Sequence, residues 1–462
     1  MQEDHRTEPG FAPQEAPPLS QAGGIESWPM AFTGDGGVYF GVWIVNILLT
    51  IVTLGLFTPW ARRRTIRYFY GHTLVAGSPL EFTAGIRSMV FGFLLFAAFY
   101  IALNVASETG QALLYGVIVA GGVLLAPFLW GSAMRFRLGH TRWRGLRLRF
   151  TAGWGEVYRA SWPVFAVAAV WLAAGLALSR MAEDPPAGPA AQQAVSADAA
   201  QAPSGDAPPA DDEDPDAGED EEDEPPPETD TPPLPRPTWA MAGVALAAAV
   251  LSLLCFVRLE FNYKRLLIER AGIGGQAGRW KPTFGDFVRI WLATLGFFLA
   301  TLLALAVLAA AIAGIAALAH GGLSALGASR GRTTVILLVI VGFVILGFAF
   351  FLAASPALAY REARMFQLMW NNIGVSHMAR FRTDLRTSAF VWLRIRNILL
   401  SMITGGFYRP FARVAEYRMK TESVTLHVRG GLEPLVGALE QEQQRGGFGD
   451  AVADALGLDM IG

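Results

Sequence analysis

The chain has 462 residues, of which 53% are hydrophobic and 16% are charged. Soluble domains carry about 25% charged residues, so a chain this poor in charge is not expected to face water on all sides. Its single cysteine, Cys255, excludes a disulfide framework and a cysteine-based zinc cluster. The composition therefore favours a membrane protein over a soluble enzyme or a small secreted domain.

The first 31 residues are rich in proline and lack the basic start and apolar core of a signal peptide. We expect them to form a disordered tail. A short apolar run follows at 46–62, with the sequence N-I-L-L-T-I-V-T-L-G-L-F-T-P-W-A-R. It recurs at 397–413 as N-I-L-L-S-M-I-T-G-G-F-Y-R-P-F-A-R. The chain therefore begins and ends with the same structural element.

The repeated motif is too short to cross a bilayer in its C-terminal copy. Arg396 precedes it and Arg409 lies within it, and the dozen residues between them reach only about 18 Å as a helix. The hydrocarbon layer is about 30 Å thick. We therefore predict that both copies are re-entrant or interfacial helical hairpins, packed against other helices that shield their irregular backbone. The matched positions are Asn46, Thr53, Gly55, Pro59 and Arg62 in the first copy, and Asn397, Thr404, Gly406, Pro410 and Arg413 in the second.

Six other segments are long and apolar enough to span a membrane, each free of charged residues over about 20 residues or more. They are 88–107, 109–134, 160–179, 237–257, 290–329 and 333–360. Basic residues favour the cytoplasmic side of short loops. With six crossings, the basic loops and both chain ends fall on one side, which is then the cytoplasmic side. With eight crossings, the two copies of the motif would point in opposite directions.

A second repeat follows the first motif. The stretch R-Y-F-Y-G-H-T at 67–73 recurs as R-F-R-L-G-H-T at 135–141, and F-T-A-G follows both at the same spacing. Alternation of apolar and polar residues at 146–150 predicts a small strand. Each cytoplasmic loop should thus repeat a helix end, a turn and a strand, and these pieces could pair with one another. Weaker copies begin at Arg258 and Arg364.

The basic side chains of these loops are candidate contacts for anionic lipid head groups, because arginine binds phosphate oxygens in a bidentate manner. The candidates are Arg67, His72, Arg135, His140, Arg142 and Arg144. The simpler interpretation is that the arginines set topology and that the two histidines only fix the turn between helix and strand. No module typical of nucleic-acid binding is present, so lipid rather than nucleic acid is the expected partner.

Residues 183–237 hold 17 acidic side chains and one basic one. Such a segment cannot bury enough apolar surface to fold, so we predict a disordered acidic linker on the periplasmic side. A spacer between two membrane halves is the simplest role, and binding of cations or of a basic partner is the alternative. The expected organisation is a tail at 1–31, membrane halves at 32–182 and 238–435 around this linker, and a tail at 436–462.

The six histidines are scattered without the spacing of metal ligands, and no catalytic motif is evident. We therefore expect no metal, no cofactor and no enzymatic activity. The predicted fold is an all-α polytopic membrane protein with about six spanning helices, two short terminal elements and small strand-like pieces in cytoplasmic loops. A structural, lipid-associated or transport-like role is the leading hypothesis. The alternative is a membrane-embedded enzyme acting on a lipid or phosphate-bearing substrate, with His72 and His140 as catalysts.

The two copies of the N…T-x-G…P-[WF]-A-R motif, together with R-Y-F-Y-G-H-T and H-T-R-W-R-G, resemble the bacterial YjgN-like inner-membrane proteins, a family classified by a domain of unknown function. The resemblance covers roughly 32–180 and 239–435, and the long acidic insert departs from the family pattern. It implies a polytopic protein of the bacterial inner membrane. It supplies no substrate, reaction or catalytic residue.

Overall fold

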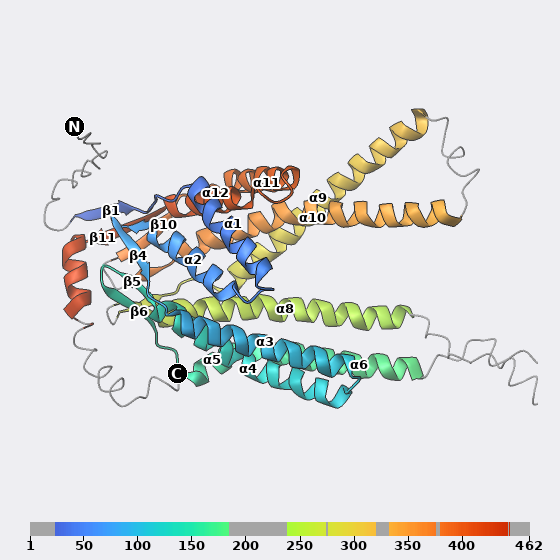
Figure 1. Cartoon of the computed structure of the whole chain (residues 1–462), viewed down its shortest axis with the longest axis horizontal. Coiled ribbons are helices and arrows are strands. Elements are labelled where there is room, and N and C mark those ends of the chain that lie inside the picture. The colour runs from blue at the N-terminus through green and yellow to red at the C-terminus, as the bar shows by residue number, and fades with distance from the viewer. Residues whose placement is uncertain are drawn as a thin grey trace, which may run out of the picture. The chain divides into compact units, whose positions relative to one another are not determined.

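The computed structural model describes residues 24–183, 238–273, 276–319, 332–375, 379–441 and 443 (Figure 1). The chain divides into two compact units, one made of residues 1–163 and 257–462 and the other of residues 164–256. The smaller unit holds most of α6 (Trp162–Glu183) and the first part of α8 (Trp239–Arg270). Residues 1–23 of the tail predicted at 1–31, residues 184–237 of the linker predicted at 183–237, and residues 444–462 lie outside the described residues. Residues 24–31 of that predicted tail are described, and they include strand residues 25–29 and 31 that pair with other strands.

In its described ranges, the larger unit contains a helix over residues 432–441 and nine labelled helices. The labelled helices are α1 (Gly36–Val52), α2 (Thr58–Gly71), α3 (Ile86–Glu108), α4 (Ala112–Gly139), α5 (Trp154–Ala160), α9 (Phe284–Ala319), α10 (Arg332–Trp370), α11 (Thr387–Ile403) and α12 (Arg409–Glu422). Among the described residues, five helices are long and apolar enough to cross a membrane: α3, α4, α6, α8 and α9. The protein is therefore a helical multi-pass membrane protein. The expected sixth segment lies in α10, where most side chains of the first half are not described, so the count of six stays a prediction.

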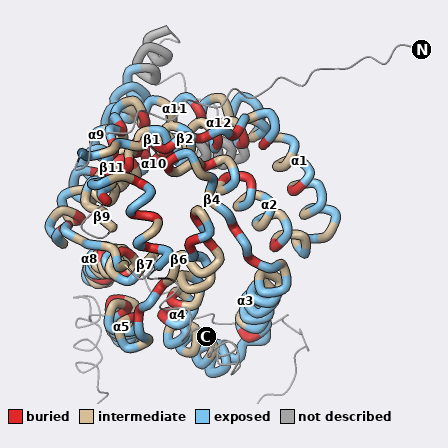
Figure 2. The backbone as a smooth tube through the Cα atoms, turned by 90° about the vertical axis from the view of Figure 1, so that its left-hand side faces the viewer, coloured by how far each residue is buried: buried red, intermediate tan, exposed pale blue. Residues whose placement is uncertain are grey.

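The strands are short but join into one continuous antiparallel sheet. They are β1 (Ile25–Pro29), β2 (Ala31–Phe32), β3 (Thr73–Val75), β4 (Ser78–Phe82), β5 (Thr141–Trp143), β6 (Leu146–Phe150), β7 (Ala271–Ile273), β8 (Gln276–Arg279), β9 (Gly374–Val375), β10 (Ala379–Thr383) and β11 (Val424–Arg429). Their order is β1-β11-β10-β9-β8-β7-β6-β5-β4-β3-β2. The first and last strands in this order are neighbours in the sequence, separated by Met30 alone, so the sheet closes into a ring (Figure 2).

Met30 is the residue that completes the ring. Its backbone N–H donates to the carbonyl oxygen of Val424 at 2.9 Å, continuing the β1–β11 ladder to the point where β2 turns to β3. The whole segment 25–32 thus acts as one bent strand that serves both neighbours. Closure leaves no exposed sheet edge, which is how barrels avoid edge-to-edge aggregation.

Chain direction places all helical hairpins on one rim of the ring. Neighbouring strands run antiparallel, and along the chain connections that contain helices alternate with short connections of one to three residues. The turns include those at Gly77 and Gly145, which have φ of +76° and +79°. The helix pairs therefore all leave from the opposite rim, and the first and last strands have their free ends on the rim that carries the turns.

The ring consists of five repeats of strand, helical hairpin and strand. In four of them, the residue after the first strand donates its backbone N–H to the carbonyl at the end of the returning helix. The pairs are Thr33–His72 (3.0 Å), Thr83–His140 (2.9 Å), Thr151–Arg270 (2.9 Å) and Asp384–Ser423 (3.0 Å). In two of these pairs the acceptor is the histidine of the repeated G-H-T stretch, so His72 and His140 occupy equivalent positions in the fold. The strand pieces also pair with one another across repeats, as in β4–β5 and β6–β7.

The interior of the ring is an apolar core closed by a helix over residues 432–441. Leu432, Leu435, Val436 and Leu439 of this helix are buried against inward-facing strand residues such as Trp143. A chamber of about 270 Å³ remains between them, lined almost wholly by apolar side chains. The helix runs across the boundary expected at 435/436.

The all-α class expected from the sequence was too narrow. The expected strand pieces do pair with one another, and in the described part of the chain they form a closed 11-stranded sheet. Each strand has only two to six residues, so no single one carries a strong sequence signal. Their stability comes from pairing with strands that are distant in the sequence.

Candidate functional site: a groove between the terminal hairpins

The repeated motif folds twice into the same helical hairpin, α1–α2 and α11–α12. In the first copy, the Asn46 side-chain amide donates to the carbonyl oxygen of Ala61 at 3.4 Å. In the second copy, Asn397 donates to the carbonyl oxygen of Ala412 at 3.3 Å, across the same separation of 15 residues. Both asparagines are buried. Each therefore holds the two helices of its own hairpin together.

The threonines of the motif shape the turn. The hydroxyl of Thr53 donates to the carbonyl of Leu49 at 2.7 Å and accepts the N–H of Phe57 at 3.0 Å. Thr404 makes the equivalent bonds to Leu400 and Tyr408, at 2.8 and 3.0 Å. One side chain thus ends the first helix and satisfies a free N–H at the start of the next.

The glycines and prolines complete the turn. Gly55 and Gly406 have φ of +91° and +95°, a region that favours glycine. Pro59 and Pro410 occupy the first turn of the second helix, where a missing N–H has no cost, and both are buried. Asparagine, threonine, glycine and proline are therefore structural determinants of the hairpin.

The two hairpins meet through α1 and α12, because β1 pairs with β11 and brings the first and last repeats side by side. Phe40 stacks on Phe411 with ring centroids 5.6 Å apart, and Trp43 meets Phe407 edge-on at 6.4 Å. A Cβ placed on Gly36 would lie 2.8 Å from Phe411, so glycine is required for this close approach.

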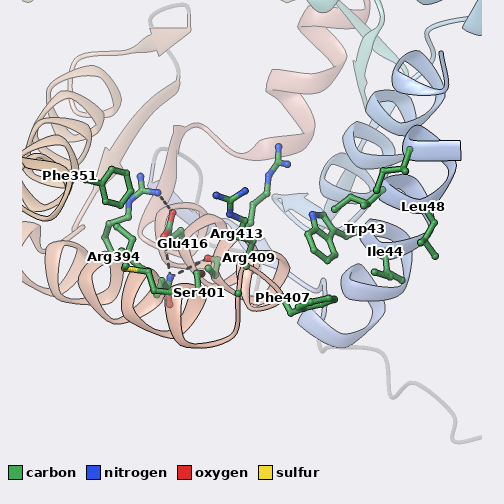
Figure 3. Close-up of a pocket in the computed structure, with 18 of the residues that line it drawn as sticks. Trp43, Ile44, Leu48, Phe351, Arg394, Ser401, Phe407, Arg409, Arg413 and Glu416 are labelled. Carbon is green, nitrogen blue, oxygen red and sulfur yellow. Dashed lines mark hydrogen bonds and ion pairs between the residues drawn. The ribbon is translucent and has the colours of Figure 1, made fainter. Parts of the chain in front are cut away.

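Beside this contact lies a cavity of about 1050 Å³, which we call the terminal groove (Figure 3). One wall is the apolar side of α1, including Ile44 and Leu48. The rest is formed by α11, α12 and the turn between them, and by Phe351 and Glu362 of α10. Arginines line it on the side of α11 and α12. They are Arg394, Arg409 and Arg413.

Three of the groove's charged groups, Arg394, Glu362 and Glu416, neutralise one another in a compact network that also includes Lys420. Arg394 forms ion pairs with Glu362 and with Glu416, the latter at 2.6 Å. Lys420 also contacts Glu362, at 2.7 Å. Glu416 in addition accepts a hydrogen bond from the Asn397 amide at 3.1 Å. The network ties α10, α11 and α12 together at the edge of the groove.

Arg409 and Arg413 are the other two arginines, and both are exposed. Within the described residues neither has a carboxylate partner. The Arg413 guanidinium donates to the Tyr39 hydroxyl at 3.3 Å and lies 5.3 Å from the centre of the Phe69 ring. These contacts orient Arg413 without neutralising it. Arg62, its counterpart in the first copy, borders a second cavity of about 470 Å³ between α1 and α2.

Tyr39, Tyr68 and Phe69 form part of the aromatic cluster that supports Arg413. The Tyr68 hydroxyl donates to the carbonyl of Asp35 at 2.6 Å. Burial raises the pKa of Tyr68, so its phenol stays neutral and remains a donor. Asp35 caps the start of α1 by accepting the N–H groups of Gly37 and Val38.

The structure does not bring the two predicted histidines together. The Nδ1 atoms of His72 and His140 lie 2.7 and 2.8 Å from the carbonyl oxygens of Tyr68 and Phe136, at the ends of α2 and α4. Each ring is thus held against its own helix. This geometry agrees with the simpler interpretation, in which both histidines fix the turn from helix to strand.

The four candidate arginines have different surroundings. Arg67 and Arg142 are exposed. Arg135 donates to the carbonyl oxygen of Ala152 at 2.7 Å and stacks 3.8 Å from the Trp154 ring. Arg144 bridges Ser78, Ala76 and Glu433, the last in the helix over 432–441. Arg135 and Arg144 therefore stabilise the fold.

Sequence reasoning missed Arg394, Arg409 and Glu416. A signal was present in the differences between the two copies of the motif. At a constant offset, these residues replace Trp43, Thr58 and Thr65 of the first copy. The groove is charged on the side of the second copy for that reason. No group of three or more histidine, cysteine or acidic side chains in the described residues is placed to hold a metal.

The fold and groove define a helical multi-pass membrane protein with a closed sheet at one end of its helices. The chain belongs to the DUF898 family of bacterial proteins of unknown function, whose model matches residues 27–455. This confirms the family suggested by the motifs.

Curated relatives are named inner membrane protein YjgN. The chain is 29% identical over 134 residues to the protein of Escherichia coli O157:H7 and 29% identical over 142 residues to that of Salmonella typhimurium. These matches cover 29% and 30% of this chain and 34% of each relative. They therefore span about a third of the length of the relatives. No solved structure matches the chain.

Proposed function

We propose that the protein is a lipid-associated protein of the bacterial inner membrane, in which the long hairpins cross the bilayer and the terminal hairpins enter only the leaflet next to the ring. The inner-membrane location rests on the names of the relatives and on the apolar helices. The role in lipid association rests on the terminal hairpins.

The observation that carries the proposal is the exposure of large apolar side chains at both hairpin tips. Leu54 is 94% exposed and Ile403 is 81% exposed, and Val52 and Phe407 lie beside them. Exposed apolar surface of this kind marks a membrane or partner contact. The tips are therefore expected to lie among acyl chains.

Charge limits how deep the tips can reach. Arg62 lies about one helical turn after the start of α2 at Thr58, and Arg409 is the first residue of α12. An arginine at the centre of the bilayer costs about 2.5–3.5 kcal/mol on insertion scales, and less near the head groups. At 17 residues, α1 and α11 are about 25 Å long, which is short of the bilayer thickness. Insertion into one leaflet satisfies both limits.

Orientation follows from the same charges. Since arginines gather at the rim where the helices meet the ring, the ring and both chain ends are cytoplasmic in this proposal. The segment 184–237 joins α6 to α8 and is then periplasmic. Arg67 and Arg142, being exposed, are the candidate arginines best able to meet anionic head groups.

The other roles are supported less well. The chamber in the ring is apolar, which does not favour passage of a polar solute through it. An enzyme using His72 and His140 would need both near one substrate, whereas each is bonded to its own helix end. Lipid association is therefore the role that the geometry favours.

The test is a measurement of depth. Nitroxide labels are placed on Leu54→Cys and Ile403→Cys in a Cys255→Ala background, and on Arg64→Cys as the control. The protein is reconstituted in bilayers, and collision with oxygen is compared with collision with a water-soluble nickel chelate. Labels at both tips should be oxygen-accessible and chelate-protected, while the control should show head-group depth. Tip labels freely accessible to the chelate would refute the proposal.

A further inference from the structure

The terminal groove combines unpaired positive charge, a buried free acceptor and an apolar wall. We propose that it binds a phospholipid with an anionic head group that carries hydroxyls, with the phosphate against Arg409 and Arg413. This assignment rests on the proposed function, because a lipid reaches the groove from the leaflet that the hairpin tips enter.

The charge balance of the lining favours an anionic ligand. Arg394 and Lys420 are matched by Glu362 and Glu416, as described above. Arg409 and Arg413 remain as two exposed guanidinium groups, and Figure 3 shows both between the α1 wall and the Arg394–Glu416 pair. Guanidinium binds phosphate oxygens through paired N–H donors.

Asn397 gives an independent indication that a polar ligand enters. The residue is 1% exposed and lines the groove, and its Oδ1 has no hydrogen-bond partner. Its amide nitrogen is already used by Ala412 and Glu416. A buried acceptor without a donor costs about 1–3 kcal/mol, so a donor is expected there. A head-group hydroxyl supplies such a donor.

The apolar wall selects a lipid rather than a free phosphate compound. Leu48, Met402 and Phe407 line the groove and are exposed. Contact between such apolar side chains and water is unfavourable. Acyl chains would cover these side chains while the head group remains at the arginines. The volume of about 1050 Å³ is at the upper end of ligand pockets, about 300–1000 Å³, and suits a head group with the upper parts of its chains.

The experiment uses the full chain in detergent, with native mass spectrometry as the readout. Phosphatidylglycerol is added to the wild type and to Arg409→Gln/Arg413→Gln, and bound lipid is counted. We expect binding to weaken by about a hundredfold, about tenfold for each charge-assisted contact. Arg64→Gln/Arg87→Gln, which removes the same charge from exposed sites outside the groove, should bind as the wild type does.

A second variant tests the acyl wall without changing charge. Leu48→Trp places a large side chain in the groove at an exposed position and should also lower binding of phosphatidylglycerol. Phosphatidylcholine should bind weakly to all variants, and neither inorganic phosphate nor glycerol phosphate should compete. Size-exclusion profiles and thermal melts of each variant show whether it is folded.

Three results would overturn the assignment. They are equal binding by the groove variant and its control, competition by inorganic phosphate alone, and equal binding of the two lipids. In each case the hairpin tips could still be found in the leaflet by the depth measurement. Tips found in water would instead refute the proposed function, so the two failures are distinguishable.

Discussion

The terminal hairpins and the α3–α4 hairpin leave the same rim of the same ring, yet they differ in how close charged residues lie to their tips. Between Arg87 and Arg135, α3 and α4 carry one charged side chain, Glu108 at the tip. The terminal hairpins have arginines within two turns of their tips. Under the proposed function, the position at which charge begins along a helix sets how deep its hairpin enters the bilayer.

The largest expected effect is a difference in which side of the membrane two positions can be labelled from. In a Cys255→Ala background, Thr109→Cys places a thiol at the tip of the α3–α4 hairpin and Arg429→Cys places one at the end of β11. A membrane-impermeant maleimide added to intact cells, with the outer membrane permeabilised, should label the first and not the second. Inverted vesicles should give the opposite pattern. Equal labelling of both sites from one side would show that the α3–α4 hairpin does not cross the membrane, which would contradict the proposed difference between long and short hairpins.

The next largest effect concerns the charge network of the second terminal hairpin. Arg394→Gln leaves Glu362 and Glu416 without their shared cation. We expect the free energy of unfolding to fall by about 2–3 kcal/mol, less than the 3–5 of a fully buried pair because the Arg394 side chain is 29% exposed. Arg265→Gln removes the Arg265–Glu269 pair on α8, where the arginine is 54% exposed, and should cost about 0.3–0.5 kcal/mol. Denaturant unfolding in micelles measures the free energy of unfolding of both variants. Similar losses in the two variants would contradict the conclusion that the Arg394 network ties α10, α11 and α12 together.

A smaller effect is expected at the hairpin turn. Gly406→Ala forces a side chain into φ of +95°, which should cost about 1–2 kcal/mol although no atom crowds the site. Gly41→Ala, in the middle of α1 and equally uncrowded, should instead stabilise by about 0.5–1 kcal/mol. A lower melting temperature for Gly406→Ala and a higher one for Gly41→Ala would confirm this difference between the turn and the helix. A change of melting temperature in the same direction for both variants would show that the turn is not held in this conformation.

The smallest effect depends on pH. Glu156 accepts hydrogen bonds from Arg270 and from the Gly153 N–H, and these lower the pKa of its carboxyl, that from Arg270 most. Because the folded pKa lies below the unfolded one, the stabilisation is complete above the unfolded pKa and is lost as pH falls through the folded value. Amide-exchange protection at Gly153 should therefore fall in acid, while that at Gly85, whose helix has no acidic residue in its first turn, should not. In Glu156→Gln the two sites should respond to acid alike.

The sequence alone determined the local elements. Long stretches free of charge predicted the membrane helices, since burying a charge in lipid is costly, and the paired motif predicted two matching terminal elements. Asn46 and Asn397 recur because each closes its hairpin by the same bond. The role of Gly55, Thr53 and Pro59 in the turn is also local, so the sequence could show it.

Only the tertiary structure decided the ring and the groove. Met30 joins β1 to β2 and completes a sheet that pairs residues as far apart in the chain as Ile25 and Arg429. The groove exists because that closure brings α1 against α12, and Arg394 pairs with two glutamates while Arg409 and Arg413 have no carboxylate partner among the described residues. Such contacts depend on which distant segments meet, and periodicity along the chain carries no information about that choice.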